Sequence, residues 1–190
     1  MRRLALLTAL ICLPASSVRA EDPMSGPQVG KPAPGFEIQI VTGDQAGKKV
    51  DQLTALNGKP VLVIFWSEVT RPGFGLLKNL EAYGRLRQPE GLEVLIVRLT
   101  DDNEGATRQA KVFHDTYDVK STIGIATAGK SGPMEYGLHD RAAMTVLLLD
   151  KEHKVLHNLA RLGPDRQDFK PVREAIDKLL GPSPVPFTEK

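Results

Sequence analysis

Two predominantly apolar segments constrain the fold of this chain more than any other feature. Val61-Leu-Val-Ile-Phe-Trp66 and Leu92-Glu-Val-Leu-Ile-Val-Arg-Leu99 are rich in β-branched residues, which is typical of central strands buried on both faces. Between them, apolar side chains recur at three- and four-residue steps, which predicts a helix: Phe74, Leu76, Leu77, Leu80, Tyr83 and Leu86. A strand–helix–strand unit of this kind implies a sheet covered on both faces.

The rest of the chain extends this pattern into one α/β domain, predicted over residues 35–181. Strands are expected at 36–41 and 122–126, and a hairpin pairs 145–149 with 155–159 across the turn 150–154. Helices are expected at 103–117 and 165–180, the second ending at Gly181. We therefore predict a central mixed β-sheet flanked by helices, with an extended lead-in at 21–34 and a loose, proline-rich tail at 182–190.

The N-terminus has the features of a secretory signal peptide. Arg2 and Arg3 precede the apolar run 4–13, and Val18-Arg-Ala20 is a small-x-small cleavage site. The apolar run is too short to cross a bilayer, which needs about 20 apolar residues. We expect residues 1–20 to be removed after Ala20; an uncleaved membrane anchor is the alternative. The chain's single cysteine, Cys12, lies within this segment.

The charge balance gives no sign of a nucleic-acid partner. The 190 residues include 25 Lys and Arg and 23 Asp and Glu. Residues 1–20 carry three of the basic residues and none of the acidic ones, which leaves 22 basic and 23 acidic side chains in the predicted mature chain. Binding to nucleic acid or to an anionic membrane surface needs concentrated Lys and Arg.

Several segments resemble a known family. Val29-Gly-Lys-Pro-Ala-Pro-Gly-Phe36, the approach Leu56-Asn-Gly-Lys-Pro60 to the strand ending at Trp66, and the strand ending at Asp150 are similar to periplasmic TlpA/ResA-like thioredoxins and AhpC/TSA redoxins. The resemblance covers about residues 29–180. It implies a thioredoxin-like fold, a periplasmic location, and thiol–disulfide or antioxidant activity at a Cys-x-x-Cys pair beginning the helix after Trp66.

The reactive positions of that family are degenerate here. The Cys-x-x-Cys pair falls on Thr70-Arg71-Pro72-Gly73, and the peroxiredoxin register places its cysteine near Phe74. The family's cis-proline corresponds to Met144, and a non-proline cis peptide costs about 2.5–4 kcal/mol. The resemblance therefore predicts a redox fold without its own redox chemistry, because thiolate attack and resolution need two sulfurs.

The remaining side chains at this site allow more than one interpretation. Thr70 is expected to cap the helix through its hydroxyl, with Pro72 in the first turn; as a nucleophile it would need a base, and Glu68 is the nearest acid. Arg71 is either an anion ligand or a solvated surface residue. Trp66 either flanks the site or ends a core strand, and with Phe74 and Met144 it could form an apolar docking patch.

No cofactor, haem or metal site is indicated. His153 and His157 are four residues apart on a predicted hairpin, roughly 13 Å along a strand, which is too far to share one ion. His114 and His139 are expected to be surface residues.

Three functional hypotheses follow. The first is a non-catalytic adaptor that holds a secreted protein or peptide on the face formed by Trp66, Glu68, Phe74 and the degenerate positions, using a backbone edge that the fold leaves free. The second is a non-thiol enzyme that reuses Thr70, Arg71 and Glu68. The third is a structural subunit that needs a redox-active partner.

Overall fold

A computed structural model describes residues 23–68 and 70–189. The predicted signal peptide and Cys12 lie outside these residues. The strands are β1 (Glu37–Ile40), β2 (Lys49–Asp51), β3 (Val61–Trp66), β4 (Glu93–Arg98), β5 (Thr122–Ala126), β6 (Met144–Leu149) and β7 (Val155–Arg161). The helices are α1 (Gln52–Ala55), α2 (Arg71–Leu86), α3 (Asn103–Tyr117) and α4 (Phe169–Leu180), with 3-10 turns at Gln88–Glu90, Gly129–Ser131, Met134–Tyr136 and Arg166–Asp168.

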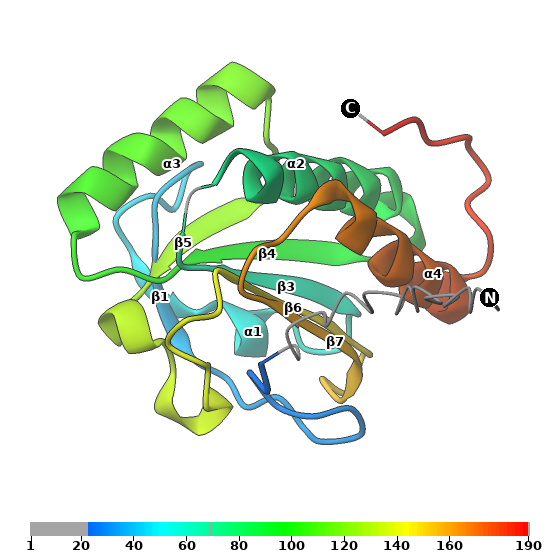
Figure 1. The fold of residues 1–190 in the computed structure, drawn as a ribbon, viewed down its shortest axis with the longest axis horizontal. Coiled ribbons are helices and arrows are strands. Elements are labelled where there is room, and N and C mark those ends of the chain that lie inside the picture. Colours follow the sequence, from blue (N-terminus) through cyan, green and yellow to red (C-terminus); the bar gives the residue numbers. More distant parts are fainter. Residues whose placement is uncertain (1–22, 69, 190) are drawn as a thin grey trace, which may run out of the picture.

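The strands form one mixed sheet in the order β2-β1-β5-β4-β3-β6-β7 (Figure 1). β3 lies between β4, to which it is parallel, and β6, to which it is antiparallel. All six residues of β3 are buried, as expected for a strand covered on both faces.

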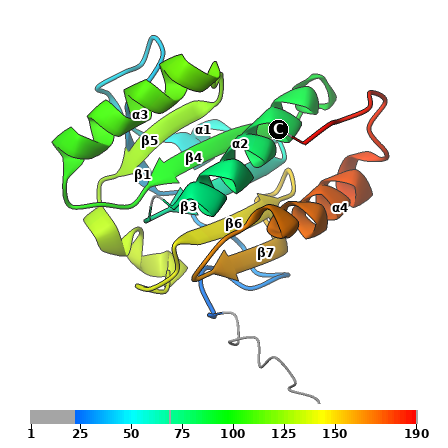
Figure 2. The same cartoon turned by 45° about the horizontal axis from the view of Figure 1, so that its top comes forward.

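Each face of the sheet has its own core. Helices α2, α3 and α4 cover one face and pack on Leu62, Ile64, Trp66 and their neighbours (Figure 2). The opposite face is covered by α1, the lead-in and the segment around Tyr136, where the rings of Phe36, Phe65 and Tyr136 have centroids 5.1–5.3 Å apart. The two parallel crossovers, β3-α2-β4 and β4-α3-β5, step in the same direction across the sheet, and this places α2 and α3 side by side.

The fold class is the one the sequence predicts. The two central strands, the helices at 71–86 and 103–117 and the hairpin at 144–161 all appear within a few residues of their expected bounds. Strand β2 and helix α1 were not predicted, because their three and four residues are too short for a periodic pattern. Within the described residues, no helix is both long enough and apolar enough to span a membrane.

The segments flanking the domain are packed against it. The lead-in runs along β7, where Gly30 N and Ala33 N donate to the carbonyls of Val155 and His153, both at 2.8 Å. The buried Ser25 hydroxyl lies 2.7 Å from that of Thr145. The tail was expected to be loose, yet Phe187 packs on Tyr83 and Phe169, with centroids 5.1 and 5.4 Å away.

Candidate functional site

The first turn of α2 occupies the place where the resemblance puts a cysteine pair. Thr70 is the N-cap, and its Oγ1 accepts a hydrogen bond from Gly73 N at 3.2 Å. Pro72 lies in the first turn, where its missing N–H has no intrahelical partner to lose. The predicted capping role of Thr70 is thereby confirmed. Among the described residues, no carboxylate or imidazole hydrogen bonds to this hydroxyl, so the geometry offers it no general base.

The second cysteine position has no room for a side chain. Gly73 is buried, and a Cβ built on it would lie 2.9 Å from Pro164 Cγ in the loop before α4 and 2.9 Å from Thr70 Oγ1. Pro164 is a buried ring that cannot swing away as a long side chain would. The helix and the loop therefore approach each other at a distance that glycine alone permits.

The loop that should face the reactive pair is closed by hydrogen bonds within the chain. Ala143 O accepts from Ser67 N at 3.0 Å and Glu68 N at 3.4 Å, and Ala143 N donates to Arg161 O at 2.8 Å. Ser67 Oγ donates to Ala142 O at 2.6 Å. The backbone edge expected to be free for a peptide at this loop is thus occupied by the chain itself, and that part of the sequence-based prediction is wrong.

Met144 and Trp66 face each other as the terminal pair of the β3–β6 ladder. Met144 is 1% exposed and Trp66 4%, so Met144 is a core residue, without surface for a partner. Trp66 Nε1 donates to Glu68 O at 2.6 Å, which fixes the indole. Glu68, Arg71 and Pro72 are exposed, whereas Phe74 is half-buried.

Arg98, which the sequence analysis did not single out, supports Trp66 from β4. Its guanidinium carbon lies 5.3 Å from the indole centroid, and Nη1 donates to Trp66 O at 2.9 Å and Leu99 O at 3.1 Å. Burial lowers the pKa of Arg98 from its usual value, yet an arginine stays charged at neutral pH after such a shift. A cation is therefore held beneath the aromatic end of β3.

An apolar pocket of about 330 Å³ opens between α2 and α3, next to the degenerate turn. Its aromatic wall is formed by Phe74, which lies 5.0 Å from Phe113 and 4.9 Å from Tyr117 between ring centroids. Val112, 63% exposed, and Tyr117, 40% exposed, form the open side. The full lining is Trp66, Phe74, Arg108, Gln109, Val112, Phe113 and Tyr117.

The predicted binding-face residues are only partly brought together by this pocket. Trp66 and Phe74 line it, whereas Glu68 and Met144 do not. Sequence reasoning missed the contribution of α3. One signal was available: Val112 lies one position from Phe113 and so departs from the helix face that carries the buried Ala106, Ala110 and Phe113.

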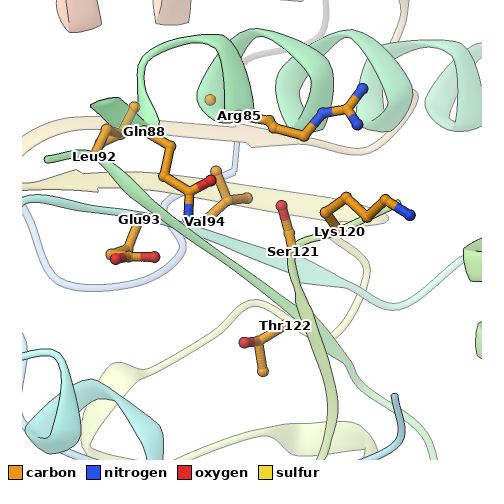
Figure 3. A pocket seen from close by; sticks show the side chains of 9 residues that line it. Arg85, Gln88, Leu92, Glu93, Val94, Lys120, Ser121 and Thr122 are labelled. Atoms are coloured by element: carbon orange, nitrogen blue, oxygen red, sulfur yellow. The ribbon is translucent and has the colours of Figure 1, made fainter. Parts of the chain in front are cut away.

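A second, polar pocket lies between α2 and the start of β5 (Figure 3). Its cations already have partners, because Arg85 and Lys120 lie 3.6 and 2.5 Å from the carboxylate of Asp118. Glu93 is held in the same way by Lys59, at 2.7 Å. With its charges paired inside the chain, this pocket offers a ligand less than the apolar one does. Within residues 23–68 and 70–189, no cluster of three or more His, Cys, Asp or Glu could hold a metal ion.

Comparison with known proteins identifies the fold. No protein-family model matches the chain, and no curated protein matches it. Among solved structures, a candidate thiol:disulfide interchange protein DsbE from Chlorobium tepidum superposes with a TM-score of 0.60 at 24% identity, covering 81% of this chain and 99% of that one. A reduced 2-Cys peroxiredoxin from Plasmodium vivax gives 0.61 at 24% identity, covering 79% and 81%. A DsbF homologue from Corynebacterium diphtheriae gives 0.60 at 17% identity, covering 90% and 99%.

The fold is thioredoxin-like. At these identities the likeness establishes the fold and leaves activity open. The thioredoxin-like chain described here has one cysteine, at position 12, and none within the described residues.

Proposed function

We propose that this thioredoxin-like protein is a redox-inactive binding protein whose recognition site is the apolar pocket between α2 and α3. The observation that supports this most is the position of the pocket: exposed apolar side chains gather beside the turn where the fold would otherwise carry its thiols. Exposed apolar surface in a concave setting is typical of a ligand or protein contact.

Thiol–disulfide exchange by a cysteine pair is excluded by the sequence. Such exchange passes through a mixed disulfide that a second thiol resolves, and the chain has a single Cys. A non-thiol enzyme built on Thr70, Arg71 and Glu68 has less support, because the Thr70 hydroxyl caps α2 and Arg71 and Glu68 are exposed. An enzyme would need these groups in a water-excluding cleft.

In this proposal, the protein recognises its partner through side-chain contacts and not through the addition of a strand. The loop edge at Ala142 and Ala143 is hydrogen bonded within the chain, so a partner cannot add a strand at these residues. The pocket instead offers aromatic walls to a side chain of the partner. We further propose that the partner is another secreted protein or peptide, and that the protein is periplasmic with its signal peptide cleaved after Ala20. The charged and apolar N-terminal regions support this localisation.

Capture from native extract tests the function. The protein as the cell processes it, tagged at its C-terminus, is cross-linked in parallel with the variants Val112→Glu and Thr116→Glu. Both substitutions add a carboxylate to the exposed side of α3, but only Val112 lines the pocket.

We expect a defined partner to be captured by the wild type and by Thr116→Glu and to be lost by Val112→Glu. The partner is then purified and its binding to all three proteins is measured by calorimetry. Equal binding by the wild type and Val112→Glu would show that the pocket is not the recognition site.

A further inference from the structure

We propose that the apolar pocket binds a peptide segment in which one aromatic or large aliphatic side chain is flanked by carboxylates. This inference rests on the proposed binding function and specifies the chemistry of the partner. It follows from three properties of the pocket: its size, its aromatic walls and the charge around its rim.

The size of the pocket fits a single anchoring side chain. Its volume of about 330 Å³ is at the lower end of the range for small-molecule sites. The rings of Phe74, Phe113 and Tyr117 meet at 66° and 67°, which leaves both ring faces and ring edges along the wall. An incoming ring can therefore pack edge-to-face, the arrangement that aromatic pairs prefer.

The rim of the pocket is cationic. On α2, Arg71, Phe74 and Lys78 share one face, because they are spaced by three and four residues. Lys78 Nζ lies 4.5 Å from the centroid of Tyr117, so this charge is held at the pocket wall. On α3, Arg108 lines the pocket directly. The N-terminus of α2 adds partial positive charge on the same side.

The cations near this rim outnumber the acids, although Glu68 is exposed three residues before Arg71 and offsets part of its charge. No acid lines the pocket. Glu104 approaches Arg108 only to 3.9 Å at an exposed position, a spacing at which an ion pair contributes little. Asp115 Oδ1 lies within hydrogen-bond distance of His114 Nδ1, at 2.8 Å. A partner with carboxylates beside its apolar anchor would therefore complement the rim, whereas a basic partner would be repelled.

Trp66 provides a direct assay, because it is the only tryptophan and it lines the pocket. The indole fluorescence of the protein is titrated with three capped pentapeptides: Asp-Asp-Phe-Asp-Asp, Lys-Lys-Phe-Lys-Lys and Asp-Asp-Ala-Asp-Asp. We expect saturable binding of the first peptide, at least tenfold tighter than either of the others at low ionic strength. The preference over the basic peptide should shrink in about 0.5 M salt, because exposed charges are screened.

Variants that reverse the charge of a rim residue test whether the rim sets the preference for the acidic peptide. In Arg108→Glu and Lys78→Glu the preference should move toward the basic peptide. Lys170→Glu on α4 is the control, because Lys170 approaches Glu174 to 3.9 Å at an i,i+4 spacing, as Arg108 approaches Glu104. The control should retain the wild-type preference.

Each contrary outcome has its own meaning. Equal binding of the acidic and basic Phe peptides would overturn the inferred partner chemistry while leaving the pocket as a binding site. Equal binding of the Phe and Ala peptides, or tighter binding of free phenylacetate, would overturn the anchored-peptide model. Self-association abolished by Val112→Glu would identify a second copy as the occupant. Absence of any binding would overturn this inference, whereas the capture experiment decides the proposed function separately.

Discussion

The contact between Gly73 and Pro164 yields a sharp prediction, because it separates two glycines in the same turn of α2. In Gly73→Ala the new Cβ would lie 2.9 Å from Pro164 Cγ, inside van der Waals contact and against a rigid ring. In Gly75→Ala the nearest atom is Arg166 Nε at 3.2 Å, on a long side chain that can move. The same substitution should therefore destabilise the protein more at position 73 than at position 75.

The magnitude follows from two opposing contributions. Replacing glycine by alanine inside a helix stabilises by about 0.5–1 kcal/mol. Overpacking a filled site costs about 1–3 kcal/mol. Gly73→Ala should lower the free energy of unfolding by up to about 2.5 kcal/mol, whereas Gly75→Ala should leave it unchanged or raise it by up to about 1 kcal/mol.

Urea unfolding followed by Trp66 fluorescence measures the free energy of unfolding of both variants. Thermal unfolding provides a second measurement, because each kcal/mol should shift the Tm by roughly 2–4 °C in a chain of this size. A Gly73→Ala variant as stable as Gly75→Ala would refute the closed-site reasoning. The same contact predicts that the double variant Thr70→Cys and Gly73→Cys is less stable than Thr70→Cys alone. Adding both sulfurs would therefore not by itself produce a well-formed cysteine pair at this turn.

Three further predictions concern stability. Arg87 is fully buried and donates to Glu90 at 2.7 and 2.8 Å, to Asp177 at 2.5 Å and to Gly181 O at 2.7 Å. Arg87→Met should cost about 3 kcal/mol in urea unfolding, because it removes all of these hydrogen bonds at once; Asp177 keeps the Tyr83 hydroxyl as a partner. Phe187→Ala should cost about 1–2 kcal/mol, less than a fully buried ring, because Phe187 is only partly buried; an unchanged midpoint would show that the tail does not stabilise the domain. Burial and the charge of Arg161 lower the pKa of His157. The folded state therefore disfavours the protonated imidazole. Stability should fall as the pH drops below about 6.5, the pKa of histidine in the unfolded chain, and through the lower pKa of the folded state. Urea midpoints at pH 7.5 and 5.5 should differ less in His157→Gln than in the wild type.

The sequence predicts best those elements in which the pattern of apolar residues extends over many positions. The apolar runs that become β3 and β4 and the three- and four-residue spacing in α2 each extend over six or more residues, so a wrong period would have been visible. The strand β2 is exposed or half-buried along its three residues and carries no such pattern. The Pro and Gly content of the lead-in predicts an extended segment, but its hydrogen bonds depend on a strand more than 120 residues later in the chain.

The candidate site was predictable only where local chemistry fixes it. Thr70 is a strong N-cap residue and needs no tertiary information. The pocket is different, because it exists only where α2 and α3 pack side by side, and no local pattern gives the separation of two helices. The closure at Ala143 likewise joins segments about 75 residues apart through the hydroxyl and amide of Ser67.

Two sets of contacts fill the region around the first turn of α2. Without a side chain at Gly73, the loop carrying Pro164 can approach α2, and the Ala143 amide donates to Arg161 O at the end of β7. With Ala143 also bound to Ser67 and Glu68, the loop before β6 is fixed to the end of β3. A reactive cysteine would need this loop free to receive a substrate chain. Glu68, whose amide donates to Ala143 O, also accepts the indole N–H of Trp66, and Trp66 forms one wall of the neighbouring pocket. The hydrogen-bonded loop before β6 and the apolar pocket therefore both depend on how the end of β3 is packed.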